Sequence, residues 1–132
     1  MPRDPHRPSP GLGGRLKVKA QLWLGAEIAM GPGKAELLHW LDQTGSISAA
    51  ARAMGLSYRR AWLMVDTMNR CFAKPLVETA HGGSKGGGAQ LSQFGHETLA
   101  AYRKLAADLD IGFTEGSTAL VGRLAKTPRL PG

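Results

Sequence analysis

Two short helical patterns separated by one tight turn constrain the fold of this chain more than any other feature. Ser46 can cap a helix over residues 47–54, and Ser57 can cap a second helix over residues 58–72. Gly55 lies between them and accepts the left-handed backbone that a sharp turn needs. Apolar residues recur at helical spacing in both segments; they are Ile47, Ala50, Ala51, Met54, Ala61, Val65, Met68 and Phe72. The pattern predicts two helices that meet at a steep angle and share one core.

Further elements are predicted on the C-terminal side of this pair. Residues 76–79 and 89–91 form strand patterns, and a glycine-rich loop over residues 81–88 joins them. Ser92 can cap a last helix that runs to about residue 110. We therefore expect a β-hairpin followed by a long helix.

On the N-terminal side, apolar and polar residues alternate over residues 16–24, which is typical of a half-buried strand. A helix over residues 34–43 follows and ends at Gly45. The expected fold class is mostly α with a small β-hairpin wing: a winged helix-turn-helix with an N-terminal strand and a long C-terminal dimerisation helix. We predict a disordered basic, proline-rich tail over residues 1–15, one domain over residues 16–111 and a flexible tail over residues 112–132.

The start of the third helix is the main candidate binding surface. In a helix pair of this kind the second helix can enter the major groove of DNA. Its first turn presents Ser57, Tyr58, Arg59 and Arg60, and an arginine there can pair with a guanine edge. The alternative is a solvated helix face. Trp62 is predicted at the boundary of the buried face, where it packs in the core, supports Tyr58 or contacts DNA.

Two other segments are candidate phosphate contacts. Ser46 and Ser48 open the second helix, although Ser46 serves equally well as a plain cap. The glycine-rich loop carries His81, Ser84 and Lys85, and glycines allow its backbone to approach a phosphate or minor groove closely. The alternative for this loop is a surface loop without a ligand.

Composition and motifs argue against other functions. The 17 Lys and Arg residues outnumber the 10 Asp and Glu residues, which favours a polyanionic partner. No P-loop, catalytic cluster or metal-ligand spacing is present, and the four histidines are scattered. We predict no enzymatic activity, no cofactor and no metal site. The single cysteine, Cys71, is expected as a small buried hydrophobe. The chain has no membrane span and no signal peptide, so we expect a cytoplasmic protein without a membrane partner.

A family resemblance covers residues 33–109. The residues that carry it are grouped as Gly45-Ser46-Ile47-Ser48-Ala49-Ala50-Ala51, Gly55-Leu56-Ser57-Tyr58, Ala61-Trp62, Met68-Asn69 and the loop segment 82–89 followed by Leu91. They resemble the N-terminal DNA-binding domain of the ModE-type, molybdate-responsive transcriptional regulators, whose helix-turn-helix part is shared with LysR-type regulators.

The resemblance implies a homodimer that binds double-stranded DNA at a palindromic operator. It places the recognition helix at residues 57–69 and the wing at residues 81–89. The stripe Leu99, Tyr102, Leu105 and Leu109 on the last helix fits dimerisation, with packing inside the chain as the alternative. Residues 112–132 do not resemble the family's molybdate-binding region, so direct molybdate binding is not expected. The alternative function is a winged-helix protein-interaction module without sequence-specific DNA binding.

Overall fold

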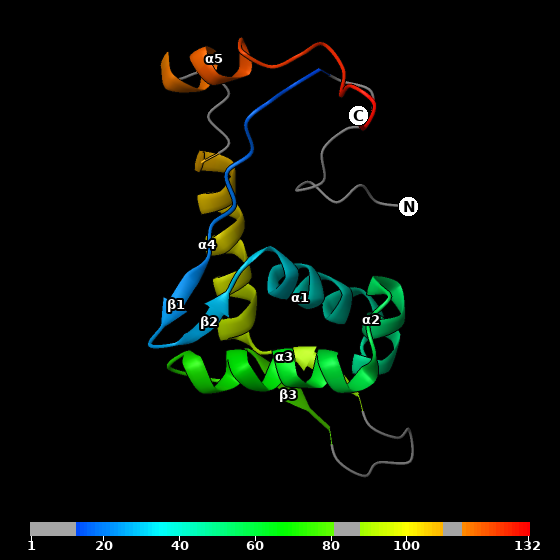
Figure 1. Cartoon of the computed structure of the whole chain (residues 1–132). Coiled ribbons are helices and arrows are strands. Elements are labelled where there is room, and N and C mark those ends of the chain that lie inside the picture. The colour runs from blue at the N-terminus through cyan, green and yellow to red at the C-terminus, as the bar shows by residue number, and fades with distance from the viewer. Residues whose placement is uncertain (1–12, 81–87, 110–114) are drawn as a thin grey trace.

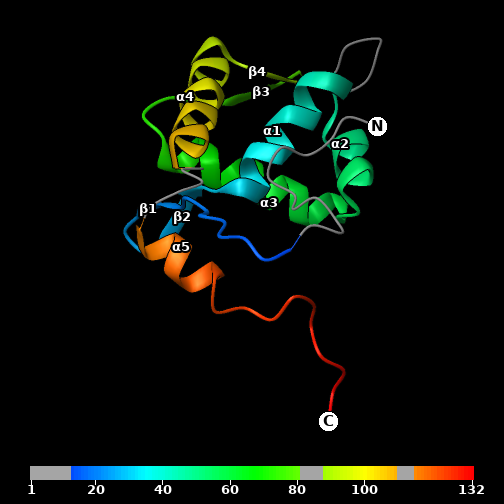
Figure 2. The same ribbon diagram turned by 90° about the horizontal axis from the view of Figure 1, so that it is seen from above.

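The computed structural model describes residues 13–80, 88–109 and 115–132, and it contains five helices and four strands in these ranges. In chain order the elements are β1 (Leu22–Leu24), β2 (Glu27–Met30), α1 (Pro32–Thr44), α2 (Ile47–Met54), α3 (Tyr58–Cys71), β3 (Val77–Thr79), β4 (Ala89–Leu91), α4 (Gln93–Leu109) and α5 (Glu115–Val121). Figure 1 shows α1 lying over α3, with α2 at one end of the pair and α4 standing at the other end. Figure 2 shows α5 away from the helices α1, α2 and α3.

The expected fold class, a winged helix-turn-helix with one N-terminal strand, is wrong. The described residues form five helices and two separate two-stranded antiparallel sheets, β1–β2 and β3–β4. The alternating segment 16–24 is a strand only from Leu22, and Gly25 then turns the chain back at a φ of 59° into β2. Because all three residues of β1 are exposed, the alternation does not mark a half-buried strand.

The remaining differences lie at the ends of the chain. Helix α1 begins at Pro32, two residues before the expected start, because proline suits the first turn of a helix. Helix α5 occupies Glu115–Val121 within the segment that was expected to be a flexible tail. Of the predicted disordered tail, residues 1–12 lie outside the described residues. The division into one domain and two tails stays a prediction.

The core lies between α1, α2, α3, α4 and the β3–β4 hairpin. Its largest fully buried side chains come from β2, α1, α3 and the position just before β3; they are Met30, Leu37, Leu38, Leu41, Met68 and Leu76. Small residues in α2 let this helix pack closely, since Ala50 and Ala51 are fully buried or nearly so. The core therefore holds α2 and α3 in a fixed relation to each other.

The corner between α2 and α3 is built by local hydrogen bonds. The Ser46 hydroxyl accepts the amide of Ala49 at 3.0 Å, and the Ser57 hydroxyl accepts the amide of Arg60 at 3.1 Å. Gly55 ends α2 with a φ of 67°, a conformation that a side chain would strain. Helix α2 thus starts and stops, and helix α3 starts, where the cap and turn residues predict, whereas α3 ends at Cys71, one residue before the expected Phe72.

The β3–β4 hairpin is attached to the helices at several points. The Ala89 amide donates to the Gly45 carbonyl at 2.8 Å, which ties β4 to the corner between α1 and α2. The Asn69 side chain accepts the amides of Leu76 and Val77 at 2.9 and 3.1 Å. Its amide group donates to the Val77 carbonyl at 3.0 Å. The hairpin is therefore fixed to α3 by one side chain.

Helix α4 approaches the start of β3 closely. The Ser92 hydroxyl caps α4 by accepting the Gly95 amide at 2.9 Å and donates to the Pro75 carbonyl at 2.7 Å. A Cβ atom at Gly95 would collide with the carbonyl oxygen of Leu76. The close contact between α4 and the hairpin therefore requires glycine at this position. Among the residues that the structure describes, no helix is long and apolar enough to cross a membrane.

Candidate nucleic-acid interface

The first turn of α3 brings four predicted contact residues to the surface. Ser57, Tyr58, Arg59 and Arg60 are all exposed, and Ser57 also serves as the cap of the helix. Trp62 is 46% exposed, so it is not a core residue. The hydroxyl of Ser57 is engaged with Arg60, which leaves the two arginines as the free charged groups of this turn.

Helical periodicity divides the exposed residues of α3 between two sides. Since Ala61, Val65 and Met68 are buried, a period of 3.6 residues places Arg59 and Leu63 directly opposite the core. Tyr58 and Trp62, four residues apart, form a neighbouring row. Asn69 lies on the same flank as this row, and it bonds to β3. Arg60 is on the other flank, toward α1.

Lys34 of α1 adds a positive charge beside α3, within electrostatic range of Arg60 near one end of that helix and of Cys71 at the other. Burial is the main cause that lowers the pKa of its ammonium group; the charges of Cys71 and Glu27 partly offset this, and that of Arg60 adds to it. Two cations that interact across α1 and α3 form a positive site because the core fixes both helices. The sequence pattern did not identify Lys34, since its proximity to Arg60 depends on how α1 crosses α3.

The opposite end of α3 carries a network of ion pairs. Arg70 donates two hydrogen bonds of 2.9 Å to the carboxylate of Glu27 in β2 and one of 2.9 Å to Asp66. Hydrogen bonding to Arg70 lowers the pKa of Glu27. Cys71 lies beside this pair, 3.5 Å from a carboxylate oxygen, and burial is the main cause that raises the pKa of its thiol. Cys71 is half-buried, so it is less enclosed than the sequence suggested.

The other candidate contacts lie in α2 and in the loop between β3 and β4. Ser48 is exposed in the first turn of α2, whereas Ser46 is half-buried and its hydroxyl is used as the cap. Ser84 and Lys85 lie outside the described residues, as does His81. Their proposed contacts stay predictions. Of the described candidates, the residues of α3 and Ser48 have side chains open to solvent.

The predicted dimerisation stripe on α4 is only partly available to a partner. Leu99 and Tyr102 belong to the core of the chain itself, at 5% and 7% exposure. The Tyr102 hydroxyl donates to the Ala20 carbonyl at 2.8 Å. Leu105 is exposed and Leu109 is half-buried. Packing within the chain therefore accounts for half of the stripe.

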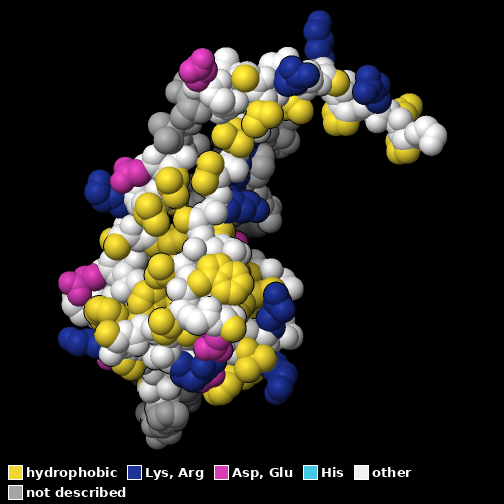
Figure 3. Space-filling model, turned by 60° about the vertical axis from the view of Figure 1, so that its left-hand side comes forward, with side chains coloured by type: hydrophobic (Ala, Val, Ile, Leu, Met, Phe, Trp, Pro, Cys, Tyr) yellow, Lys and Arg dark blue, Asp and Glu magenta, His cyan; other side chains and the backbone are white. Residues whose placement is uncertain are grey.

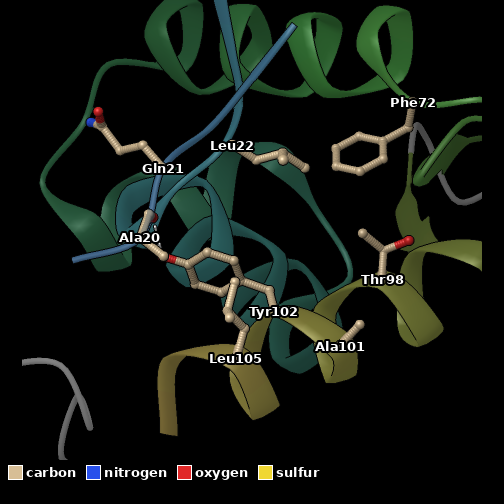
Figure 4. Close-up of a pocket in the computed structure, with 8 residues that line it drawn as sticks. All are labelled: Ala20, Gln21, Leu22, Phe72, Thr98, Ala101, Tyr102 and Leu105. Atoms are coloured by element: carbon tan, nitrogen blue, oxygen red, sulfur yellow. Dashed lines mark hydrogen bonds between the residues drawn. The ribbon is translucent and has the colours of Figure 1, made fainter. Parts of the chain in front are cut away.

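A groove lies between α4, the end of α3 and the segment that leads into β1 (Figure 4). It has a volume of about 240 Å³ and is lined almost entirely by apolar atoms. Its lining residues are Ala20, Gln21, Leu22, Phe72, Thr98, Ala101, Tyr102 and Leu105. Figure 3 shows hydrophobic side chains gathered over this side of the molecule. We call the groove and the exposed residues of β1 the apolar face.

Metal-ligating groups do not assemble in the described part of the chain. Residues 13–80, 88–109 and 115–132 contain no group of three or more His, Cys, Asp or Glu side chains that could hold a metal ion. The nearest approach of a histidine to a carboxylate that is recorded there, His96 to Asp42, is 3.9 Å between exposed side chains.

Comparison with known proteins identifies relatives that are connected with molybdenum. The chain is 49% identical over 78 residues to the molybdenum-pterin-binding protein MopB of Rhodobacter capsulatus, covering 59% of this chain and 29% of that protein. It is 42% identical over 91 residues to the molybdenum transport protein ModE of Azotobacter vinelandii, covering 69% and 34%. It is 38% identical over 92 residues to the DNA-binding transcriptional dual regulator ModE of Escherichia coli K12, covering 70% and 35%.

The chain spans about a third of the length of these curated relatives. No family model matches it. None of the three names describes an enzymatic reaction. The matches extend over about 60–70% of the chain, and they support a relationship between this chain and the ModE-like proteins.

Proposed function

We propose that this chain is a sequence-specific DNA-binding regulator linked to molybdenum, and that it corresponds to the DNA-binding part of the ModE-like proteins. The observation that carries the proposal is the pair of exposed arginines, Arg59 and Arg60, in the first turn of α3. No ion pair or hydrogen bond to either side chain is recorded within the described ranges. One relative is named as a DNA-binding regulator, and the names of the others refer to molybdenum.

The proposed mechanism separates affinity from sequence preference. Lys34 and Arg60 lie on the flank of α3 toward α1, where contacts to phosphates set affinity and register. Arg59 projects opposite the core and is proposed to reach a base edge, which contributes about 1–3 kcal/mol of discrimination. Ser48 of α2 is proposed as a further phosphate contact. The Ser57 hydroxyl acts indirectly, because it caps the helix that carries these side chains.

The test is to measure the affinity of the full chain for duplex DNA by fluorescence anisotropy. Duplexes are selected from a random pool, and scrambled duplexes serve for comparison. Arg59→Ala should lower affinity for the selected sequence more than for the scrambled one. Arg60→Ala should weaken both about equally. Arg123→Ala is the matched control, since it removes the same charge from an exposed site after α5. Equal affinity of all three variants and the unaltered chain would contradict the proposal.

The alternative, an interaction module for proteins, makes a different prediction. Such a module would not be retained on duplex DNA or heparin at near-physiological salt. A DNA-binding protein is retained, and the logarithm of its affinity falls linearly with the logarithm of salt concentration, by about 0.9 per neutralised phosphate. The formal net charge of +7 favours DNA, because a basic surface attracts a polyanion.

We further propose that two copies associate through the apolar face. β1 pairs only with β2 in the part of the chain that the structure describes, so its other edge is open. A strand edge can pair with its own copy across a twofold axis. The groove beside it would receive apolar side chains of the partner. A twofold dimer fits a palindromic operator.

Sedimentation equilibrium tests this association. Leu105→Lys places a charge in the groove and should shift the protein toward the monomer. Ala107→Lys adds the same charge to an exposed position of α4 that does not line the groove. A dimer that resists Leu105→Lys, or a monomer at all concentrations of the unaltered chain, would exclude the apolar face as the interface.

Molybdate itself is not proposed as a ligand of the described residues. Titration with molybdate should therefore leave the midpoint of thermal unfolding unchanged. A ligand that binds only the folded state raises this midpoint in proportion to the logarithm of its concentration at saturation. A midpoint that rises with the logarithm of the molybdate concentration would contradict the prediction.

A further inference from the structure

Three large apolar side chains lie exposed on α3 beside the arginines. Tyr58, Trp62 and Leu63 are 56%, 46% and 43% exposed. Tyr58 and Trp62 are neighbours on one flank, and Leu63 follows Arg59 by one helical turn. We call these three residues the apolar strip. Exposed apolar groups that gather on one surface mark a place where another molecule binds.

The charges around the apolar strip restrict the kind of molecule that fits. Arg59 lies within it, Arg60 lies on the other flank, and Lys34 of α1 is within electrostatic range of Arg60. A ligand must therefore combine negative charge with apolar groups at short range. The major groove of DNA does so, because phosphates border it and thymine methyl groups project from its floor. The groove is also wide enough to admit one helix.

We propose that the apolar strip contacts the 5-methyl groups of thymines, so that α3 reads A·T pairs through Tyr58, Trp62 and Leu63 in addition to any guanine read by Arg59. The inference rests on the proposed function and assigns a chemical preference to the same surface. Trp62 is central to it, since it lies between Tyr58 and Leu63 on the helix surface. Arg59 would read the polar groups of a base edge. The apolar strip would recognise the methyl group, because contact with the strip removes this group from water.

The size of the effect follows from the burial of one methyl group. Removal of a buried methyl from water changes a binding constant by about fourfold. A thymine contacted by the apolar strip should therefore bind about fourfold more tightly than uracil at the same position. Deoxyuridine lacks only this methyl group and keeps the hydrogen-bonding pattern of thymine.

The experiment uses the full chain and the duplex selected from the random pool. Each thymine is replaced by deoxyuridine in turn, and the affinity is measured by fluorescence anisotropy. We expect one or more positions at which the uracil duplex binds about fourfold more weakly. In Trp62→Ala or Leu63→Ala, the difference between thymine and uracil should disappear at the contacted position. Leu120→Ala is the matched control for Leu63→Ala, because Leu120 is exposed on α5.

Each outcome decides a separate question. Duplex binding that is insensitive to every deoxyuridine replacement overturns this inference and leaves the proposed function intact. A selected sequence without thymine does the same. Discrimination that survives unchanged in the alanine variants shows that another surface contacts the methyl groups, which also overturns it. Absence of any DNA binding overturns both proposals. Circular dichroism of the variants confirms that they are folded, as expected for exposed positions.

Discussion

Asn69 offers the sharpest test of how the hairpin is attached to α3. Asn69→Ala removes the acceptor for the amides of Leu76 and Val77 and the donor to the Val77 carbonyl. Leu76 and Val77 are buried, so water replaces the lost partners poorly. A buried donor without an acceptor costs about 1–3 kcal/mol. For the two amides together, with some access of water to the space left by the side chain, we expect a loss of about 2–4 kcal/mol.

Urea denaturation followed by circular dichroism measures this loss. With a dependence of about 2 kcal/mol per molar urea, the midpoint should fall by about 1–2 M at unchanged slope. Asn69→Asp retains acceptors for both amides and should lose less than the alanine variant. Thr67→Ala is the matched control, because the Thr67 hydroxyl donates to the Leu63 carbonyl of its own helix and, among the described residues, to no other group. A loss below about 0.5 kcal/mol for Asn69→Ala, the range of ordinary surface substitutions, would refute the reasoning.

Three further predictions concern single contacts. Gly95→Ala should destabilise the fold by about 1–3 kcal/mol, because the collision of the added Cβ atom with the backbone outweighs the helix preference of alanine. Gly33→Ala meets no close contact and should be neutral or stabilising. Thermal unfolding measures both variants. Tyr102→Phe should cost about 0.5–1.5 kcal/mol in urea denaturation through loss of its bond to the Ala20 carbonyl, and a neutral result would argue against that bond. The folded-state pKa of Glu27 is lowered, so its ion pair contributes stability above the ordinary value of 4.5 and loses it as the pH falls through the lower folded value. Glu27→Gln should therefore make stability less dependent on pH in acid, as followed by unfolding at a series of pH values.

Local chemistry made part of the fold predictable. The bounds of α2 follow from Ser46 and Gly55, which act within a few residues of where they stand. The prediction of the N-terminal strand was wrong because it also rested on local sequence alone. Alternation over residues 16–24 satisfies the pattern of a half-buried strand, but it carries no information about whether another element covers its apolar side. The turn at Gly25 and the pairing of β1 with β2 depend on tertiary context.

The candidate site was likewise predictable only in part from the sequence. Exposure of Tyr58, Arg59 and Arg60 follows from the helical period and from the buried positions of α3. The positive site at Lys34 and the attachment by Asn69 could not be predicted, since both join residues of different elements. Helical periodicity also selected Leu99 and Tyr102 as one face of α4, but it does not distinguish a core inside the chain from a contact between two chains.

The pairing of Arg70 with Glu27 and Asp66 makes α3 electrically asymmetric from end to end. At this end Arg70 and the neighbouring Lys34 balance the two carboxylates, while the start of the helix carries uncompensated arginines and the positive end of the backbone dipole. A long anionic surface therefore attracts the start of the helix more strongly than its end, and this difference turns the molecule as it approaches. When the two molecules meet, the first turn of α3 then already faces the anionic surface. Added salt should therefore slow association, because it screens the electrostatic torque that orients the protein as it approaches.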